Sequence, residues 1–516
     1  MYNECQPGNI GGVNRHLQDF EFRWAFLAVA LALTLVMLPG AGHAEERVAA
    51  AAAEPQPPLQ APQTQSQVPK TTLSWETREG RSYLIPGLEI IGYIFLLNQY
   101  DRHFARDKEA YRSDGDTIGR NLTDSKWVID NDQFEVNQFL HPYSGSIYYG
   151  LARSAGLNFW ESFLYAAAGS YIWEIAGETT APSINDQVNT TFGGTFLGEP
   201  LFRMASLLLE GGPPTFWREL GAAIISPPTG FNRLVFGNRF DAVYPSRDPA
   251  IFTRFQVGGT LTSTSHNISD DVIENGGTAD FSLAYGLPGK PGYSYSRPFD
   301  YFDFHFTAVT SNTFESINTR GLLIGTDYAS GNATRGIWGL YGSYDYISPQ
   351  VFRVSSTALS LGTTWQTWLS RLVALQGTVL GGAGYGAAGN VHIAGDRDYH
   401  YGATPQALLA LRLIFGDRAM FDLTGREYYV SGVGSPEPHA WENIIRGEAS
   451  AMLRIYGRHG VALQYVVSHR DAHYPFINAK DQTVGTLSLM YVFLGGSRLG
   501  AVEWRGEEIG PRASAF

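Results

Sequence analysis

The sequence has little charge, a single cysteine and no apolar run in its body long enough to cross a bilayer. Charged residues make up 17% of the 516 residues, below the roughly one quarter that is usual in globular proteins, which disfavours an ordinary soluble enzyme. The longest apolar stretch beyond the N-terminal region, Ser162–Trp173, is shorter than the ~20 residues that a transmembrane helix needs. A net charge of -12 disfavours nucleic acid as a partner, because phosphate binding requires a basic face.

The N-terminus predicts an export signal over residues 1–44. Trp24–Leu38 is an apolar run that a Pro-Gly pair ends, and small residues precede a cleavage site after Ala44. A run of about 15 residues is short for a membrane span, with an uncleaved anchor as the alternative. Cys5 lies within this signal, so the exported chain would contain no cysteine and no disulfide. Residues 45–72, rich in Ala, Pro and Gln, predict a disordered linker.

Glycine and aromatic residues are abundant instead, with 58 Gly and 13% aromatics. From about 250 to 496, polar and apolar residues alternate over about twelve segments, as where Arg254 and Gln256 alternate with Phe255. We predict a transmembrane antiparallel β-barrel of about 12 strands, whose polar rows line the lumen and whose apolar rows face lipid. A soluble β-sandwich is the alternative, but it has little reason to form an outward row of Trp338, Leu340, Tyr344 and Tyr346.

The links between the predicted strands differ in length. Short links such as 330–332 and 457–460 predict tight periplasmic turns. Long polar links predict outer loops, at 264–276, 288–299, 386–399 and 431–440. Residues 497–516 follow the last predicted strand as a tail without a strand pattern.

The last predicted strand carries one apolar row, formed by Gly485, Leu487, Leu489, Tyr491 and Phe493. This row resembles the C-terminal assembly signal of bacterial outer-membrane barrels, although here further residues follow it. The resemblance implies that the protein lies in the bacterial outer membrane. It also implies that the barrel-assembly machinery and outer-membrane lipid are partners, and that the row Leu487–Phe493 faces lipid.

Residues 80–248 predict a helical domain, so the fold class is α+β. Four segments have helical length and boundaries: Leu88–Phe104, Pro142–Ala155, Asn158–Ala176 and Thr190–Leu209. Asn158 and Glu161 form an N-terminal capping box, and Pro200 is expected to kink or split the fourth helix. Because none of them is long enough to span a bilayer, we expect the helical part to be periplasmic, docked beneath the barrel, or to occupy the barrel lumen.

The candidate site residues are His141, Glu174, Glu178 and Asp186. Glu174 and Glu178 are spaced by four, so they share a face if the helix continues past Gly177, and buried carboxylates need a partner, a metal ion or a proton. The short link between the second and third predicted helices makes them antiparallel and brings His141 beside Glu174. With Asp186 from the following loop, we predict one buried polar cluster. The alternative for His141 is a helix cap or a bond to a backbone carbonyl.

Three further charged residues are interpreted as structural. Arg153 lies at the far end of the predicted hairpin from Glu174, so we expect it to pair elsewhere, with Glu161 as a candidate. Glu199 and Arg203 are spaced by four and can pair on one helix face. We interpret them as an exposed pair that contributes little to stability.

The order of these residues resembles a bacterial family known only as a domain of unknown function, which joins a helical N-terminal part to an outer-membrane barrel. The resemblance rests on N-Q-F-L-H-P-Y-S-G-S-x-Y-Y-x-x-A-R from Asn137, on G-S-x-x-W-E ending at Glu174, and on G-x-x-x-G-E ending at Glu199. It covers roughly residues 130–210. The resemblance implies this architecture and no particular activity.

Two functions remain open at this point. The sequence has no nucleophile elbow, phosphate loop or dinucleotide fingerprint, so no cofactor is predicted, and metal binding is left open. The first function is binding, transport or envelope maintenance, with the helical domain plugging or docking on the barrel. The second is an envelope lipid- or glycan-modifying enzyme whose site includes His141 and the three carboxylates. An open pore would favour the first, and a sealed lumen beside perturbed carboxylates would favour the second.

Overall fold

The computed structural model describes residues 72–504, apart from 106, 131, 267–268, 350, 391–398, 434–438 and 476. The expected export signal, nearly all of the expected linker and residues 505–516 lie outside the described residues. Signal cleavage and linker disorder therefore stay predictions.

The first described part of the chain is helical. Its α-helices are α2 (Leu84–Phe104), α3 (Gly115–Thr123), α4 (His141–Ser154), α5 (Phe159–Ile172), α6 (Ile184–Val188), α7 (Gly194–Glu210), α8 (Phe216–Ile225) and α9 (Pro227–Phe236). Short π-helical segments adjoin them at η2 (Val136–Leu140), η3 (Trp173–Gly177) and η4 (Asn189–Gly193). The four predicted helices are confirmed with shifted ends, whereas α3, α6, α8 and α9 are not among the predicted helices. Asp186, expected in a loop, lies in α6. No helix in the described ranges combines the length and apolarity needed to cross a membrane.

The second part is a closed antiparallel barrel of twelve strands, as predicted. The strands are β1 (Ile251–His266), β2 (Ser269–Tyr285), β3 (Phe302–Val309), β4 (Asn312–Ser330), β5 (Thr334–Ile347), β6 (Phe352–Trp368), β7 (Val373–Asn390), β8 (Tyr399–Phe415), β9 (Ala419–Val430), β10 (Trp441–Tyr456), β11 (His459–Tyr474) and β12 (Ile477–Leu494). Polar residues such as Arg254 and Gln256 are buried in the lumen, and Leu487, Leu489 and Tyr491 are exposed on the outer wall. The predicted assignment of rows to the two faces is therefore confirmed.

Two predicted outer loops are wrong. Residues 264–276 largely continue β1 and β2 as a long hairpin rather than forming a loop. Residues 288–299 link β2 to β3. This link lies at the end of the barrel where the tight turns lie, where β1 begins and where β12 ends. This link is long because it holds the helices. The Arg203 side chain donates hydrogen bonds to the Pro298 carbonyl and to Asp300, which follows the link.

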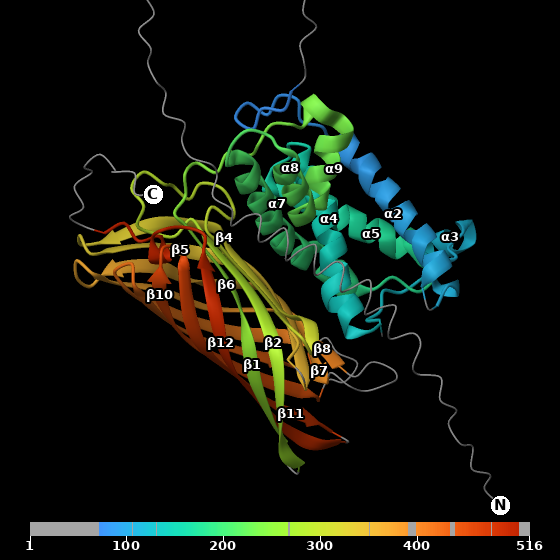
Figure 1. Cartoon of the computed structure of the whole chain (residues 1–516). Coiled ribbons are helices and arrows are strands. Elements are labelled where there is room, and N and C mark those ends of the chain that lie inside the picture. The colour runs from blue at the N-terminus through green and yellow to red at the C-terminus, as the bar shows by residue number, and fades with distance from the viewer. Residues whose placement is uncertain are drawn as a thin grey trace, which may run out of the picture.

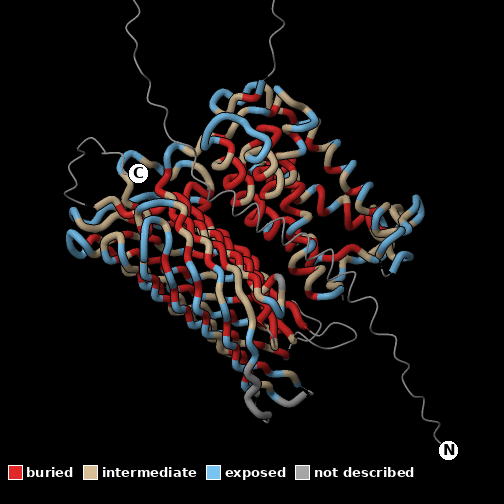
Figure 2. Tube along the Cα trace, viewed as in Figure 1, coloured by how far each residue is buried: buried red, intermediate tan, exposed pale blue. Residues whose placement is uncertain are grey.

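The described helices lie along the outer wall of the barrel, and not in its lumen (Figure 1). One continuous apolar core joins helical residues such as Tyr148 and Phe196 to outward-facing side chains of β2–β5, β7 and β8. In Figure 2, buried residues concentrate on the helices and strands that face each other. The outward row of β5 is thus divided. Trp338 is exposed, whereas Tyr344 and Tyr346 are covered by the helices.

The barrel wall also explains why Pro200 does not split α7, which runs unbroken through it. A proline has no N–H group, so the carbonyl four residues earlier, that of Phe196, loses its helical donor. The Thr319 hydroxyl of β4 donates a hydrogen bond to that carbonyl at 3.1 Å. The expected split is therefore wrong, because the strand supplies the missing donor, and the expected kink stays a prediction.

The lumen is filled by side chains of the barrel itself. Ion pairs cross it from strands that are not neighbours: Arg254–Asp422 at 2.5 Å, Arg426–Asp345 at 2.9 Å and Arg446–Glu315 at 3.4 Å. A cavity among Arg320, Asp345, Gln406 and Arg426 has a volume of about 20 Å³, which is room for about one water molecule.

The segment after β12 closes one mouth of the barrel. Leu499 and Val502 are fully buried, and the Gln376 side chain donates to the Gly500 carbonyl inside the mouth. The described part of the predicted tail, residues 497–504, is therefore packed into the barrel rather than free. Its apolar residues match the apolar lumen side chains at this end.

Candidate functional site

Three of the four predicted site residues meet. His141 begins α4, Glu174 lies in η3 and Asp186 lies in α6. One ligating atom from each lies within 4.8 Å of the others, and His141 Nε2 is 3.9 Å from Asp186 Oδ2. The predicted convergence of His141 with Glu174 and Asp186 is confirmed. Whether these residues bind or catalyse stays a prediction.

The local backbone around this cluster is unusual, because three π-helical segments surround it. The first ends just before His141, the second contains Glu174 and the third contains Thr190. A π-helical turn inserts an extra residue into a helix and is frequent at functional sites. Three polar residues, His141, Glu174 and Thr190, thus lie in or directly after a π-helical segment.

Hydrogen bonds hold the cluster in place. The Ser183 backbone N–H donates to Glu174 Oε2 at 2.7 Å, and His141 Nδ1 lies 3.2 Å from Thr190 Oγ1. The Asn185 amide Nδ2 donates to Asp186 Oδ1 and also to Asp130 Oδ1, each at 2.9 Å. Asp130 thus brings a further carboxylate to the edge of the site.

The barrel completes the surroundings of the site through two tyrosines of β8. The Tyr401 hydroxyl accepts hydrogen bonds from Gln138 and Asn185, and the Tyr399 hydroxyl accepts one from Asn137. Both tyrosines lie on the outward row of β8, opposite the lumen. The site therefore lies at the junction of the helices and the barrel wall.

Burial dominates the electrostatics of the cluster. It lowers the pKa of His141 to about 4, so the imidazole is neutral at pH 7. Burial also raises the pKa of Glu174, and the charge of Glu178 adds to this effect. The pKa of Asp186 is raised by burial and then by the charges of Asp130 and Glu174. Without a compensating cation, the two carboxyl groups therefore keep their protons to a higher pH than exposed carboxyl groups do.

Glu178 does not join the cluster. The helical conformation ends at Gly177, and Glu178 has extended backbone angles, so the condition for its sharing a face with Glu174 is not met. The Glu178 carboxylate instead accepts from Trp173 Nε1 at 2.8 Å and from the Thr180 hydroxyl at 3.0 Å. The prediction of a four-residue cluster is wrong in this member, because the helix ends earlier than expected.

The charged residues interpreted as structural are paired differently from the prediction. Glu161 caps α5 together with Asn158 as expected, but it does not pair with Arg153. The Arg153 guanidinium donates to Glu199 at 2.8 and 3.1 Å, and Arg203 donates to the same carboxylate at 2.7 Å. Glu199 is fully buried, so its interpretation as part of an exposed pair is wrong.

Sequence reasoning missed Asp130 and Thr190 as members of the site. Asp130 lies outside any helix, next to a bridge between Val128 and Ser183, and no local pattern marks it. Thr190 was placed at the start of an ordinary helix, where its hydroxyl would carry no special meaning. Only the π-helical segment turns it toward His141.

The arrangement suits two kinds of chemistry. A neutral imidazole and two carboxylates are common ligands for a divalent transition-metal ion. The arrangement also resembles a nucleophilic site, with the Thr190 hydroxyl as nucleophile, the His141 imidazole as base and the Asp186 carboxylate as the group that orients the base. In both cases the chemistry takes place beside the outer wall of the barrel.

Comparison with solved structures finds bacterial outer-membrane barrels. The outer membrane channel COG4313 from Pseudomonas putida F1 is 12% identical, with 49% of this chain and 100% of that chain covered and a TM-score of 0.26. The translocator domain of the autotransporter NalP from Neisseria meningitidis is 14% identical, with 46% and 88% covered and a TM-score of 0.22. At such scores we draw no functional inference from them. A search of the curated proteins finds no match.

The helical segment that builds the site does match a family model. Residues 126–228 match the family described as "Domain of unknown function (DUF3943)". This range includes His141, Glu174 and Asp186, and the match confirms the resemblance that the sequence motifs predicted.

Proposed function

We propose that this outer-membrane barrel protein binds a divalent cation at His141, Glu174 and Asp186. The 3.9 Å separation of His141 Nε2 and Asp186 Oδ2 carries the proposal. It is too long for a hydrogen bond, but two ligands of one ion at about 2.0–2.2 Å each lie roughly 3.3–3.6 Å apart at a tetrahedral angle and up to about 4.4 Å apart at wider angles. A ligating oxygen of Glu174 lies within 4.8 Å of the ligating atoms of both His141 and Asp186.

A cation also accounts for the electrostatics of the cluster. Two carboxyl groups whose pKa values are raised by burial are costly to ionise. A dication between them offsets that cost, and the neutral His141 needs no further charge. Thr190 and Ser183 then act as positioning residues, since their hydrogen bonds orient His141 and Glu174.

Conduction through the lumen is disfavoured by the same structure. Ion pairs such as Arg446–Glu315 cross the lumen, and Leu499 and Val502 fill one mouth. We therefore assign the barrel the role of a membrane anchor that holds the helical domain against its wall.

Titration calorimetry on the purified protein, stripped of metal with a chelator, tests the proposal. Zn²⁺ and Mn²⁺ are titrated separately into the parent protein and into the Glu174→Gln and Asp186→Asn variants. We expect one site per chain in the parent for at least one ion, and at least a tenfold weaker affinity in both variants. Glu219→Gln, far from the cluster, is the matched control and keeps the parental affinity. Absence of binding in the parent, or equal binding in all four proteins, contradicts the proposal.

The second candidate is an envelope lipid-modifying enzyme, favoured by the 3.2 Å contact between Thr190 Oγ1 and His141 Nδ1. In that case the Thr190 hydroxyl attacks an ester carbonyl, and His141 accepts its proton and passes it to the alcohol that leaves as the ester bond breaks. Water then hydrolyses the acyl group from Thr190. Incubation with phospholipid or lipopolysaccharide, followed by mass spectrometry, detects released acyl groups. Thr190→Ala abolishes that release while cation binding persists, and unchanged lipids with the parent protein exclude this candidate.

A further inference from the structure

We propose that the helical domain is itself seated in the lipid of the outer membrane, with α2 and α5 facing acyl chains. The helices then replace lipid along one side of the barrel and continue the apolar surface of the barrel around it. This inference is independent of cation binding and differs from both expected positions, the periplasm and the lumen.

The first support is the depth, along the bilayer normal, at which the helices cover the barrel wall. The residues Tyr491, Val257, Ala279 and Ala308 form one registered row across β12, β1, β2 and β3. Tyr491 and Val257 are 45% and 37% exposed on the free wall, whereas Ala308 is 3% exposed. Because the helices cover the same row that faces lipid two strands away, they lie at the depth of the bilayer.

The second support is the outer surface of α2. Every exposed residue from Leu84 to Tyr100 is apolar: Leu84, Leu88, Ile91, Gly92, Phe95, Leu96 and Tyr100. The one carboxylate in this stretch, that of Glu89, has both oxygens buried inside the domain. A helix of 21 residues is about 30 Å long, and this apolar surface follows most of its length.

Basic residues mark the two ends of this apolar stripe. Arg78 and Arg81 precede α2 with partly exposed side chains, and Arg102 and His103 lie in its last turn. Long basic side chains beside an apolar surface can extend from it toward polar lipid headgroups. A helix that faced water along its whole length would not confine its charges in this way.

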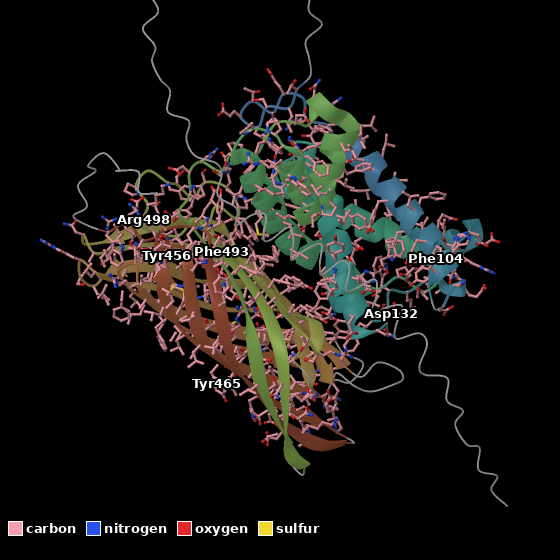
Figure 3. All side chains as sticks on the ribbon, in the orientation of Figure 1. Phe104, Asp132, Tyr456, Tyr465, Phe493 and Arg498 are labelled. Carbon is pink, nitrogen blue, oxygen red and sulfur yellow. The ribbon has the colours of Figure 1, made fainter. Side chains whose placement is uncertain are left out.

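A neighbouring helix repeats the pattern. The exposed positions of α5 are Trp160, Leu164, Ala168 and Tyr171, which lie on one face at helical spacing. Figure 3 shows Phe104 at the outer edge of the helices, away from the strands, and Tyr465 on the free wall of the barrel.

Continuity with the barrel identifies lipid, rather than a second copy of the chain, as what covers this surface. The free wall carries exposed apolar residues on many strands, including Leu261, Leu463 and Leu489, and such a wall in an outer-membrane barrel is covered by acyl chains. Soluble proteins rarely expose an apolar surface of this extent.

Lipid quenching tests the proposal in the full-length protein with Cys5→Ser. A single cysteine replaces Leu88, Phe95 or Leu164 in turn and carries a fluorescent label. Each protein is reconstituted into phospholipid vesicles with or without brominated acyl chains, and iodide serves as the aqueous quencher. Leu463→Cys on β11 is the lipid-facing control, and Glu109→Cys, whose native side chain is 73% exposed, is the aqueous control. Far-UV circular dichroism confirms that each variant folds.

We expect brominated lipid to quench the three helical positions at least half as strongly as it quenches Leu463→Cys, with iodide quenching well below that of Glu109→Cys. Strong iodide quenching without lipid quenching places the domain in water and overturns the proposal. Quenching by neither agent shows that protein covers the stripe, and also overturns it. None of the labelled positions belongs to the cation site, so the result does not depend on cation binding.

Discussion

Replacing Glu199 by Gln removes the anion that two buried arginines share. The carboxylate accepts two hydrogen bonds from Arg153, one from Arg203 at 2.7 Å and one from the Tyr149 hydroxyl at 2.7 Å. Burial alone would raise the pKa of Glu199, but the charges of Arg153 and Arg203 outweigh burial and lower it to about 2. Glu199 is therefore ionised at neutral pH and is central to this network.

The expected loss of stability follows from the contacts that each arginine keeps in the Glu199→Gln variant. Arg203 still contacts Asp300 at 3.1 Å, whereas Arg153 is left with the Leu157 carbonyl and aromatic faces. Removing one partner of a buried ion pair costs about 3–5 kcal/mol, since the other charge stays buried without compensation. We expect Glu199→Gln to lower the free energy of unfolding of the helical domain by that amount.

Glu219→Gln is the matched control. Glu219 also accepts two hydrogen bonds from one arginine, Arg233, but its side chain is 35% exposed. Exposed pairs contribute only about 0–1 kcal/mol. Urea unfolding in detergent, followed by the helical circular dichroism signal, measures both variants. Equal losses for the two variants would refute the reasoning.

The lowered pKa of Glu199 also sets the direction of pH dependence. Its stabilisation is present above the pKa of about 4.5 in the unfolded chain and is lost as the pH falls toward 2. Stability of the helical domain should therefore fall in this acidic window in the parent protein. The Glu199→Gln variant should lose less over the same window, and an equal loss in both contradicts this assignment.

Two further predictions concern the site and the lumen. Cation affinity should rise with pH, because Glu174 and Asp186, whose pKa values are raised, must release protons to bind an ion. A profile that is flat with pH, measured by calorimetry, argues against these ligands. In planar bilayers the protein should show no steady conductance, because the Arg446–Glu315 pair and the buried Leu499 obstruct the lumen. A stable open channel contradicts that description.

The barrel could be predicted from the sequence because the strand period is two. Once Arg254 and Gln256 are assigned to the lumen, the faces of the neighbouring residues follow, and pairing carries the assignment around the closed sheet. The meeting of His141 with Glu174 was predictable for a similar reason. A short link between two helices of equal length, α4 and α5, brings their far ends together.

The position of the helices could not be predicted, because a strand that faces lipid and a strand that packs against helices both need apolar side chains on the outward face. Trp338 and Tyr344 share an outward row, yet the first is exposed and the second is buried beneath the helices. Both side chains are aromatic, and the residue type does not indicate whether lipid or a helix covers it. The exclusion of Glu178 was equally hidden, since it depends on where the helix ends at Gly177.

The contact between helices and barrel makes the site depend on both parts of the chain. Tyr401 accepts hydrogen bonds from Gln138 and from Asn185, and Asn185 in turn bonds Asp186. Tyr401→Phe removes that acceptor from the barrel side and should weaken cation binding by about tenfold, as loss of a partner behind a metal ligand does. Tyr465→Phe, on the exposed wall, is the control. Calorimetry with an intact barrel in both variants measures the difference. An unchanged affinity in Tyr401→Phe would show that the helices hold the site without the barrel, whereas a selective loss shows that docking on the wall completes it.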